Sequence, residues 1–427
     1  MNFETLYGWV KDLPIIDWHN HLDMRMLSDD KPLGSLYEVW VKSDPYKHRA
    51  MRICGEPERV ITGDAEEDEK WAAWMRTLPK LVGNPLFAWA KMELEWLNVF
   101  NAESQRRGEG EWWRSIENVS LADWTPSKML KRFNVEYLSP CVGVDADLAT
   151  KSTEGTKTAP SLRINAGDEI FEEMLERFNA AGCRIVDVSV DDVSQLSTLN
   201  SQLSTVAAFA AAHGWMMLLH LGALRETSAR LRAAAGPAGG FAGMRAPVDP
   251  AAVAAFLNKL EATPNVFSHK EHKDRKESSA HSVPLRERNT SLPRTILLSL
   301  NPEAHAQLAV LAGSFVEEGV PGKVQLGPAW WWCDHEEGIR DVLEKNAAYG
   351  VLSTFVGMTT DSRSLLSFVR HDYFRRVLCK WVAEKVASGA FPDDESLLRP
   401  MLENVCYRNA MGIFSHKERK DRKEELK

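Results

Sequence analysis

The strongest constraint on the fold of this chain is a series of eight short apolar runs, most of which are followed by a helix-like segment. Buried parallel strands read as nearly continuous apolar runs, because both faces of the sheet are covered. Eight strand–helix units in succession predict an α/β fold, a TIM-type (β/α)8 barrel. The predicted strands cover residues 15–22, 135–141, 159–164, 184–190, 215–222, 294–300, 324–330 and 351–358.

Residues 30–130 interrupt this alternation, because they contain no good strand candidate. Helical segments are predicted at 33–40, 67–77 and 85–99. We therefore expect residues 1–29 and 131–427 to form a distorted barrel and residues 30–130 to form an inserted helical subdomain.

Composition and charge exclude several classes of protein. The 427-residue chain has a formal net charge of −8 and a pI near 5.9, which argues against broad affinity for nucleic acid. Its six cysteines are scattered without a Cys-x-x-Cys pair, as is typical of reduced thiols. No stretch reaches the roughly 18 apolar residues that span a bilayer. We expect a cytoplasmic protein without a nucleic-acid or membrane partner. Whether the chain forms a homo-oligomer stays open.

The first predicted strand ends in two histidines, His19 and His21, one residue apart. Residues i and i+2 of a strand point to the same side, so both imidazoles can reach one point in space. Neutral imidazoles are common ligands of divalent metals. The active sites of such barrels also lie at the carboxyl ends of the strands. The pair therefore predicts part of a metal site, although an incidental surface pair is the simpler explanation of the motif alone.

Two later strands also end in residues suited to such a site. His220 ends an apolar run, where it is either a third imidazole at the site or a buried core histidine. Asp361 follows the last predicted strand and could be a metal ligand or a proton carrier, with Arg363 placed to hold a substrate carboxylate. A helix-capping Asp-Ser-x-Ser turn is the alternative explanation of the last two residues.

Two histidines at the end of one strand, a further histidine at the end of another and an aspartate after the last resemble the metal-dependent barrels of the amidohydrolase superfamily. Longer motifs make the resemblance narrower, and the sequence is similar to the uronate (glucuronate) isomerase family from about residue 5 to residue 414. The motifs that carry this resemblance are Asp17–Leu22, Asp44–Arg52, His220–Arg225, Trp330–Asp334, Gly357–Ser364 and Arg370–Arg376.

The resemblance implies an aldose–ketose isomerase of hexuronates, which interconverts D-glucuronate with D-fructuronate and D-galacturonate with D-tagaturonate. It implies that a divalent metal, commonly zinc, is bound by His19, His21 and Asp361. It also implies catalytic roles near the metal for Asp361, Tyr46, Arg363 and His220, with Asp361 and Tyr46 as candidates for proton transfer. The substrate-binding residues implied by the resemblance are Arg225, the candidate partner of the C6 carboxylate, together with Arg163, Trp330 and Trp331.

Three departures from the family pattern leave substrate preference open. Val188 stands where the fourth strand usually has histidine after Cys-Arg-x-x-Asp, and the stretches 139–143 and 236–243 lack the usual acidic residues. Two alternatives therefore remain: a metal-dependent hydrolase of an ester, lactone or amide, and a non-catalytic protein that binds sugar acids. No lysine at a strand end is placed to bridge two metals, which counts against the hydrolase.

Two charged segments, 267–277 and 414–424, are identical except at one position. A solvated helix is the expected structure of each, and nothing in the sequence explains why the segment occurs twice.

Overall fold

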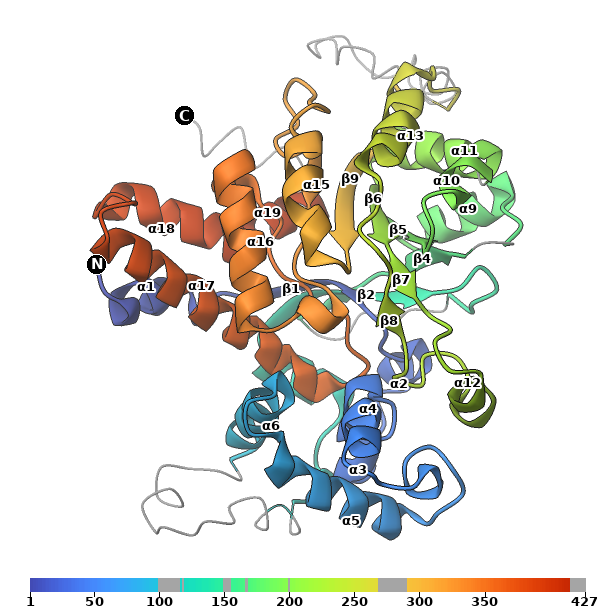
Figure 1. Ribbon diagram of the computed structural model, residues 1–427, viewed down its shortest axis with the longest axis vertical. Coiled ribbons are helices and arrows are strands. Elements are labelled where there is room, and N and C mark those ends of the chain that lie inside the picture. The colour runs from blue at the N-terminus through green and yellow to red at the C-terminus, as the bar shows by residue number, and fades with distance from the viewer. Residues whose placement is uncertain are drawn as a thin grey trace.

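The computed structural model of the chain describes residues 1–98, 116, 119–148, 155–165, 168–198, 200–267 and 290–414. Within them, a curled parallel sheet has the strand order β1-β2-β4-β5-β6-β9-β10 (Figure 1). These strands are β1 (Ile15–Asn20), β2 (Val135–Val142), β4 (Ser161–Ile164), β5 (Ile185–Val190), β6 (Met216–Leu221), β9 (Arg294–Ser299) and β10 (Val324–Leu326). The α/β barrel prediction is confirmed, with seven of the eight expected strands in place.

Apolar side chains make the centre of this sheet its most deeply buried part. All six residues of β5 and all six of β6 are buried. The two strands pair in unbroken parallel register, with Ile185 opposite Met216 and Ser189 opposite His220. The helices that follow the central strands lie outside the sheet (Figure 1). They are α9 (Glu172–Ala180), α10 (Gln195–Thr198), α11 (Asn200–Ala212), α13 (Pro250–Ala262), η4 (Pro302–Ala304), α15 (His305–Ala312) and α16 (Glu336–Tyr349).

The prediction of an eighth strand at 351–358 is wrong. The segment begins with the 3₁₀ helix η6 (Leu352–Thr354) and continues without strand structure. Gly357 has a φ of +79°, and a side chain there would collide with the carbonyl of Val405. The residues after this segment still join β1, because Asp361 N–H donates to the His19 carbonyl at 3.0 Å and His21 N–H donates to the Ser362 carbonyl at 2.7 Å.

Smaller strands and connections complete the barrel. The expected strand 324–330 stops at Leu326, because Gly327-Pro328 follows and proline has no N–H to donate to a sheet. The remaining elements of this part are β3 (Lys157–Thr158) beside β2, the antiparallel pair β7 (Ala223–Leu224) and β8 (Gly243–Met244), α12 (Ala229–Ala235) and η5 (Trp331–Cys333).

The described residues between β1 and β2 form helices joined by loops and contain no strand. Capping residues explain where several of its helices begin: Asp44 before Pro45, Asn84 before Pro85, and Thr125 before Pro126. Many of its apolar side chains form a hydrophobic cluster separate from that of the central strands. Its helices are α2 (Met24–Asp29), α3 (Leu36–Trp40), α4 (Pro45–Ile53), η1 (Glu58–Val60), α5 (Glu67–Thr77), η2 (Leu78–Leu81), α6 (Pro85–Trp96) and α8 (Pro126–Arg132).

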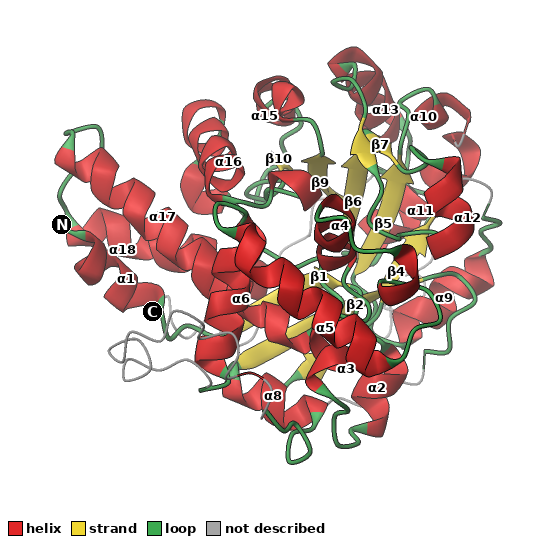
Figure 2. Cartoon of the chain, turned by 60° about the horizontal axis from the view of Figure 1, so that its bottom comes forward, coloured by secondary structure: helices red, strands yellow, loops and turns green. Residues whose placement is uncertain are grey.

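The C-terminal helices return across the N-terminal one (Figure 2). Helix α1 (Phe3–Val10) packs against α17 (Val369–Ala387) and α18 (Glu395–Glu403). The chain reaches α17 through η7 (Leu365–Phe368) and leaves α18 through the π-helical turn η8 (Asn404–Arg408) and α19 (Asn409–Phe414). Of the two charged segments, all but the buried Phe267 and Phe414 lies outside the described residues. No helix in the described ranges is both long and apolar enough to cross a membrane.

Candidate active site

His19, His21 and Asp361 converge at the carboxyl end of β1, as predicted. The Nε2 atoms of His19 and His21 lie 3.3 and 3.1 Å from Oδ1 of Asp361. The two histidines point to the same side because one residue separates them along the strand. Asp361 is held beside them by its own N–H, which binds the backbone of β1.

The nitrogen and oxygen atoms that His19, His21 and Asp361 direct toward one another could bind a divalent cation. Both ring nitrogens of His19 and Oδ1 of Asp361 are buried, and within the described part of the chain they have no hydrogen-bond partner. Buried polar atoms without partners are costly. One ligand atom from each of His19, His21 and Asp361 lies within 4.8 Å of the others. Two imidazoles and a carboxylate are a ligand set that zinc accepts, so these residues can hold a metal.

The protonation states of Asp361, His21 and His19 are compatible with binding a metal. Burial alone would raise the pKa of Asp361, but the close imidazoles of His19 and His21 hold it well below its usual value. Burial lowers the pKa of His21 to about 4. Burial would also lower the pKa of His19, but Asp361 and Asp187 outweigh it and raise that pKa. An ionised carboxylate therefore faces at least one neutral imidazole at neutral pH.

Asp17, the first residue of the Asp-x-His-x-His motif, fixes the segment that carries Asp361. Its fully buried carboxylate accepts hydrogen bonds from the Thr360 N–H at 2.7 Å and from the Thr360 hydroxyl at 2.9 Å. Nε2 of His371 on α17 donates to it at 3.0 Å. Sequence reasoning missed the role of this residue, although the motif contained it.

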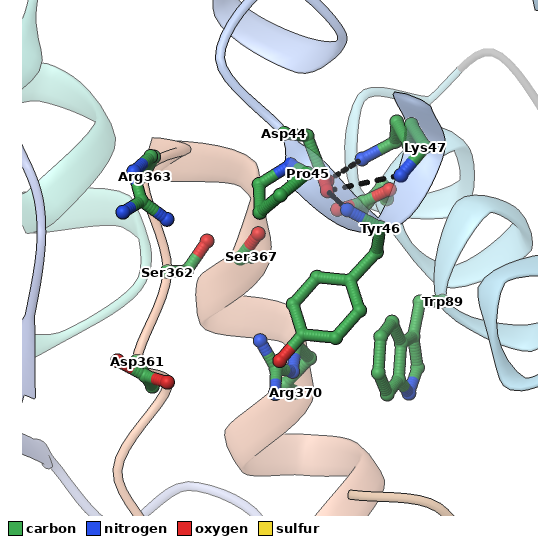
Figure 3. A pocket seen from close by; sticks show the side chains of 11 residues that line it. Asp44, Pro45, Tyr46, Lys47, Trp89, Asp361, Ser362, Arg363, Ser367 and Arg370 are labelled. Carbon is green, nitrogen blue, oxygen red and sulfur yellow. Dashed lines mark hydrogen bonds and ion pairs between the residues drawn. The ribbon is translucent and has the colours of Figure 1, made fainter. Parts of the chain in front are cut away.

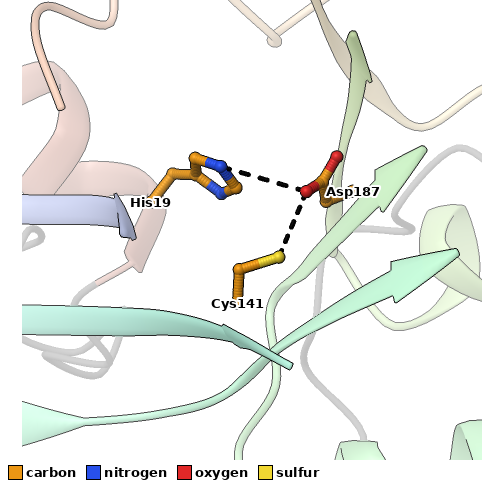
Figure 4. A group of neighbouring side chains, drawn as sticks. All are labelled: His19, Cys141 and Asp187. Atoms are coloured by element: carbon orange, nitrogen blue, oxygen red, sulfur yellow. Dashed lines mark hydrogen bonds and ion pairs between the residues drawn. The ribbon is translucent and has the colours of Figure 1, made fainter. Parts of the chain in front are cut away.

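Asp187 within β5 contacts several predicted residues, and sequence reasoning missed it as well. Nδ1 of His220 donates to Oδ1 of Asp187 at 2.6 Å, and Nη1 of Arg163 donates to Oδ2 at 2.7 Å. Sγ of Cys141 lies 3.1 Å and Nε2 of His19 lies 3.9 Å from the same Oδ2 atom (Figure 4). Arg163 and His220 help hold the pKa of Asp187 well below its usual value, against the effect of burial. The family stretch Cys-Arg-x-x-Asp-His contains this aspartate, so a signal for it was present.

Position 188 does not face the site. Successive strand residues point to opposite sides, and Asp187 and Val188 are consecutive in β5. Val188 is fully buried in the hydrophobic cluster of the central strands. The replacement of histidine by valine there therefore leaves the group around Asp187 intact.

His220 and Trp330 lie against His19 and Asp361. The ring centroid of His220 is 5.2 Å from that of His19 and 4.5 Å from that of Trp330. Nε1 of Trp330 donates to Oδ2 of Asp361 at 3.1 Å. Trp330 therefore orients the carboxylate oxygen that does not face the two histidines.

Arg225 is brought near this group but is already paired. Its Nε donates to Asp191 at 2.9 Å and its Nη2 donates to the Ser189 hydroxyl at 3.1 Å. Its guanidinium lies 5.2 Å from the ring centroid of Trp331. Arg163 donates to the same Ser189 hydroxyl, so two cations converge at the carboxyl end of β5.

A pocket opens beside Asp361, between the barrel and the helical segment. Figure 3 shows Asp361, Ser362 and Arg363 on one side of it and Tyr46 with Trp89 on the other. Burial raises the pKa of Tyr46, and the charge of Asp361 adds to this effect. Within the described residues, the guanidinium of Arg363 makes no ion pair, so it is a cation available at the pocket wall.

Arg370 at the floor of this pocket was also missed as a site residue. It forms an ion pair with Asp334, and both side chains are buried. Its guanidinium lies 4.4 Å from the ring centroid of Trp89. The Trp330–Asp334 and Arg370–Arg376 motifs contain both partners, but no feature of the sequence pairs them.

Fold and site together define an α/β-barrel protein with a histidine–carboxylate group, suited to a metal, at the carboxyl ends of its strands. The chain belongs to the glucuronate isomerase family, whose sequence model matches residues 2–163 and 272–414. This confirms the resemblance.

Individual relatives agree with this assignment. A uronate isomerase of Geobacillus thermodenitrificans is 31% identical over 474 residues, which cover 96% of this chain and 96% of that protein. One of Serratia proteamaculans is also 31% identical, with 96% and 95% covered. The solved uronate isomerase of Thermotoga maritima has a TM-score of 0.77 at 24% identity, with 96% of this chain and 97% of that chain covered. The glucuronate isomerase of Caulobacter crescentus has a TM-score of 0.77 at 19% identity, with 98% and 94% covered. These two structures support the fold.

Proposed function

We propose that this chain interconverts D-glucuronate with D-fructuronate and D-galacturonate with D-tagaturonate through an enediol. The observation that carries the proposal is the convergence of His19, His21 and Asp361 beside a pocket lined by Tyr46 and Arg363. Membership of the glucuronate isomerase family supports the same reaction.

His19, His21 and Asp361 are the proposed ligands of a divalent cation, with zinc as the first choice for two imidazoles and a carboxylate. When bound, such a cation polarises a substrate C–O group and stabilises negative charge on its oxygen. His220 stays beside this position because Asp187 holds its ring by a 2.6 Å hydrogen bond.

Isomerisation removes a proton from C2 and returns one to C1. Asp361 is the proposed carrier of the proton because it is ionised and faces the pocket. Tyr46 is its proposed partner. The raised pKa of Tyr46 keeps the phenol protonated at neutral pH, so it can donate a hydrogen bond to a developing oxyanion.

The C6 carboxylate of the substrate needs a fixed cation. Arg225 was the candidate from the sequence, and the aromatic face of Trp331 orients it. The charge of Arg225 is partly neutralised by Asp191. Arg363 has no ion-pair partner in the described residues, so its charge is more available to the substrate. We propose that Arg225 and Arg363 both face the substrate, with Arg163 and Trp330 lining the wall near Asp187.

The test is incubation of the full chain with each uronate and a divalent metal in deuterated water, followed by NMR. Ketose that carries deuterium at C1 is expected, because the enediol is reprotonated from a group that exchanges with solvent. Absence of ketose from both uronates would overturn the proposal. Hydrolysis of an ester, lactone or amide would then support the hydrolase, and uronate binding without turnover would support the binding protein.

We also propose that residues 30–130 act as a subdomain whose helix α4 brings Tyr46 to the barrel. A separate hydrophobic cluster supports this division. A cytoplasmic location is a further proposal, and six free cysteines support it.

A further inference from the structure

A second group of metal-ligand side chains lies next to the first. Cys141 near the end of β2 and Asp187 within β5 face His19 across the barrel interior (Figure 4). Sγ of Cys141 lies 3.1 Å from Oδ2 of Asp187, and Nε2 of His19 lies 3.9 Å from the same oxygen. Ligand atoms of a tetrahedral zinc ion lie at separations of this order, since each is about 2.0–2.3 Å from the metal.

An unpartnered side chain points into this group. His19 is 1% exposed, and neither of its ring nitrogens has a hydrogen-bond partner among the described residues. One histidine therefore belongs to two groups of possible ligands, one completed by His21 and Asp361 and the other by Cys141 and Asp187.

The two groups differ in the metals they favour. His21 and Asp361 add only nitrogen and oxygen ligands to His19. Cys141 adds sulfur, and thiolate sulfur selects soft or borderline ions. Cys141 lies in the stretch 139–143, where this chain departs from the family pattern, so the sulfur is a feature of this chain rather than of the motif.

We propose that Cys141, Asp187 and His19 form a second cation position, for a thiophilic divalent ion such as Cd²⁺ or excess Zn²⁺, that competes with the first position for His19. Binding exchanges the thiol proton of Cys141 for the ion, releases that proton to solvent and changes no oxidation state. The charges of Asp187 and the thiolate balance the ion, while Arg163 keeps its hydrogen bond to Asp187. An ion at this position withdraws His19 from the first position, so a soft metal in excess inhibits whatever reaction that position supports.

The test is titration of the metal-free full chain with Cd²⁺ alone, followed by the ultraviolet charge-transfer band of sulfur-bound cadmium. The band is specific because the first position contains no sulfur. It is expected in the wild type and in His21→Ala, which removes a ligand of the first position only. Because no uronate is present, the outcome does not depend on the proposed isomerase activity.

Cys141→Ser is expected to abolish the band, and Cys54→Ser is the matched control. Cys54 is also partly buried, but it lies at the end of α4, away from this group. Asp187→Asn keeps the thiol and is expected to weaken cadmium binding by roughly tenfold or more, with circular dichroism reporting that the variant is folded. The proposal is overturned if the wild type shows no band, if Cys141→Ser keeps it, or if Cys54→Ser loses it.

Discussion

Asp17 on strand β1 and His371 on helix α17 are 354 residues apart in the sequence, yet Nε2 of His371 lies 3.0 Å from Oδ1 of Asp17. The same carboxylate accepts the N–H of Thr360, the residue before Asp361. One buried charge thus joins the start of the barrel, its irregular closing segment and a C-terminal helix. The position of Asp361 relative to His19 depends on this connection.

Asp17→Asn is expected to lower the free energy of unfolding by about 2–4 kcal/mol, because several buried donors lose a charged acceptor. Denaturant unfolding measures the change. Asp12→Asn is the control, since the Asp12 side chain is 83% exposed in its pair with Lys11, and exposed substitutions usually change stability by less than about 0.5 kcal/mol. Equal stabilities of the two variants would contradict the role of Asp17.

The loop 236–243 contacts α4, the helix that carries Tyr46. Gly240 has a φ of +82°, and a side chain there would collide with the carbonyl of Pro45, the first residue of α4. Arg52, also on α4, donates to the carbonyl of Gly239. Gly240→Ala is therefore expected to displace α4 and to lower the rate of ketose formation by roughly 100-fold, the size of effect that a 1 Å misplacement can have.

Gly236→Ala is the matched control for this substitution. Gly236 also has a positive φ, +69°, but nothing lies within 4 Å of an added Cβ. Both variants carry the backbone cost of a side chain at positive φ, and only Gly240→Ala carries the collision. Equal rates for the two variants would show that contact between the loop and α4 does not position Tyr46.

His48 makes folding sensitive to acid. Burial lowers its pKa from 6.5 to about 4, so below pH 6.5 the unfolded chain binds a proton that the folded chain does not. Stability therefore falls as the pH drops from about 6.5 to 4, and this one group accounts for up to about 3 kcal/mol. His48→Gln is expected to flatten the slope of unfolding free energy against pH over that range. An unchanged slope would mean that His48 titrates alike in both states.

Local patterns were enough to predict part of the fold and part of the site. Strand alternation placed His19 and His21 on one side, and the position of Asp361 after an apolar run placed it at the same end of the barrel. Arg363 followed from its place two residues after Asp361. Tyr46 came only from the family motifs, because nothing at the start of a helix predicts that the residue faces a distant strand.

Features that depend on tertiary pairing were not predictable in this way. The carboxylates of Asp17 and Asp187 gain their roles from partners on other strands and on α17. The run 351–358 is apolar enough for a strand, but the positive φ of Gly357 and the packing of Val405 against it prevent one. The family pattern indicated a missing site histidine at position 188, whereas strand alternation directs that side chain away from the site.

The most direct test of the account is the initial rate of ketose formation from D-glucuronate by wild type and by Asp361→Asn under identical metal supplementation. Asparagine keeps the shape of the side chain but removes the charge that faces His19 and His21. The account predicts a fall of roughly 10²–10⁴-fold, the usual contribution of a positioned proton carrier. A variant that forms ketose at the wild-type rate would contradict it.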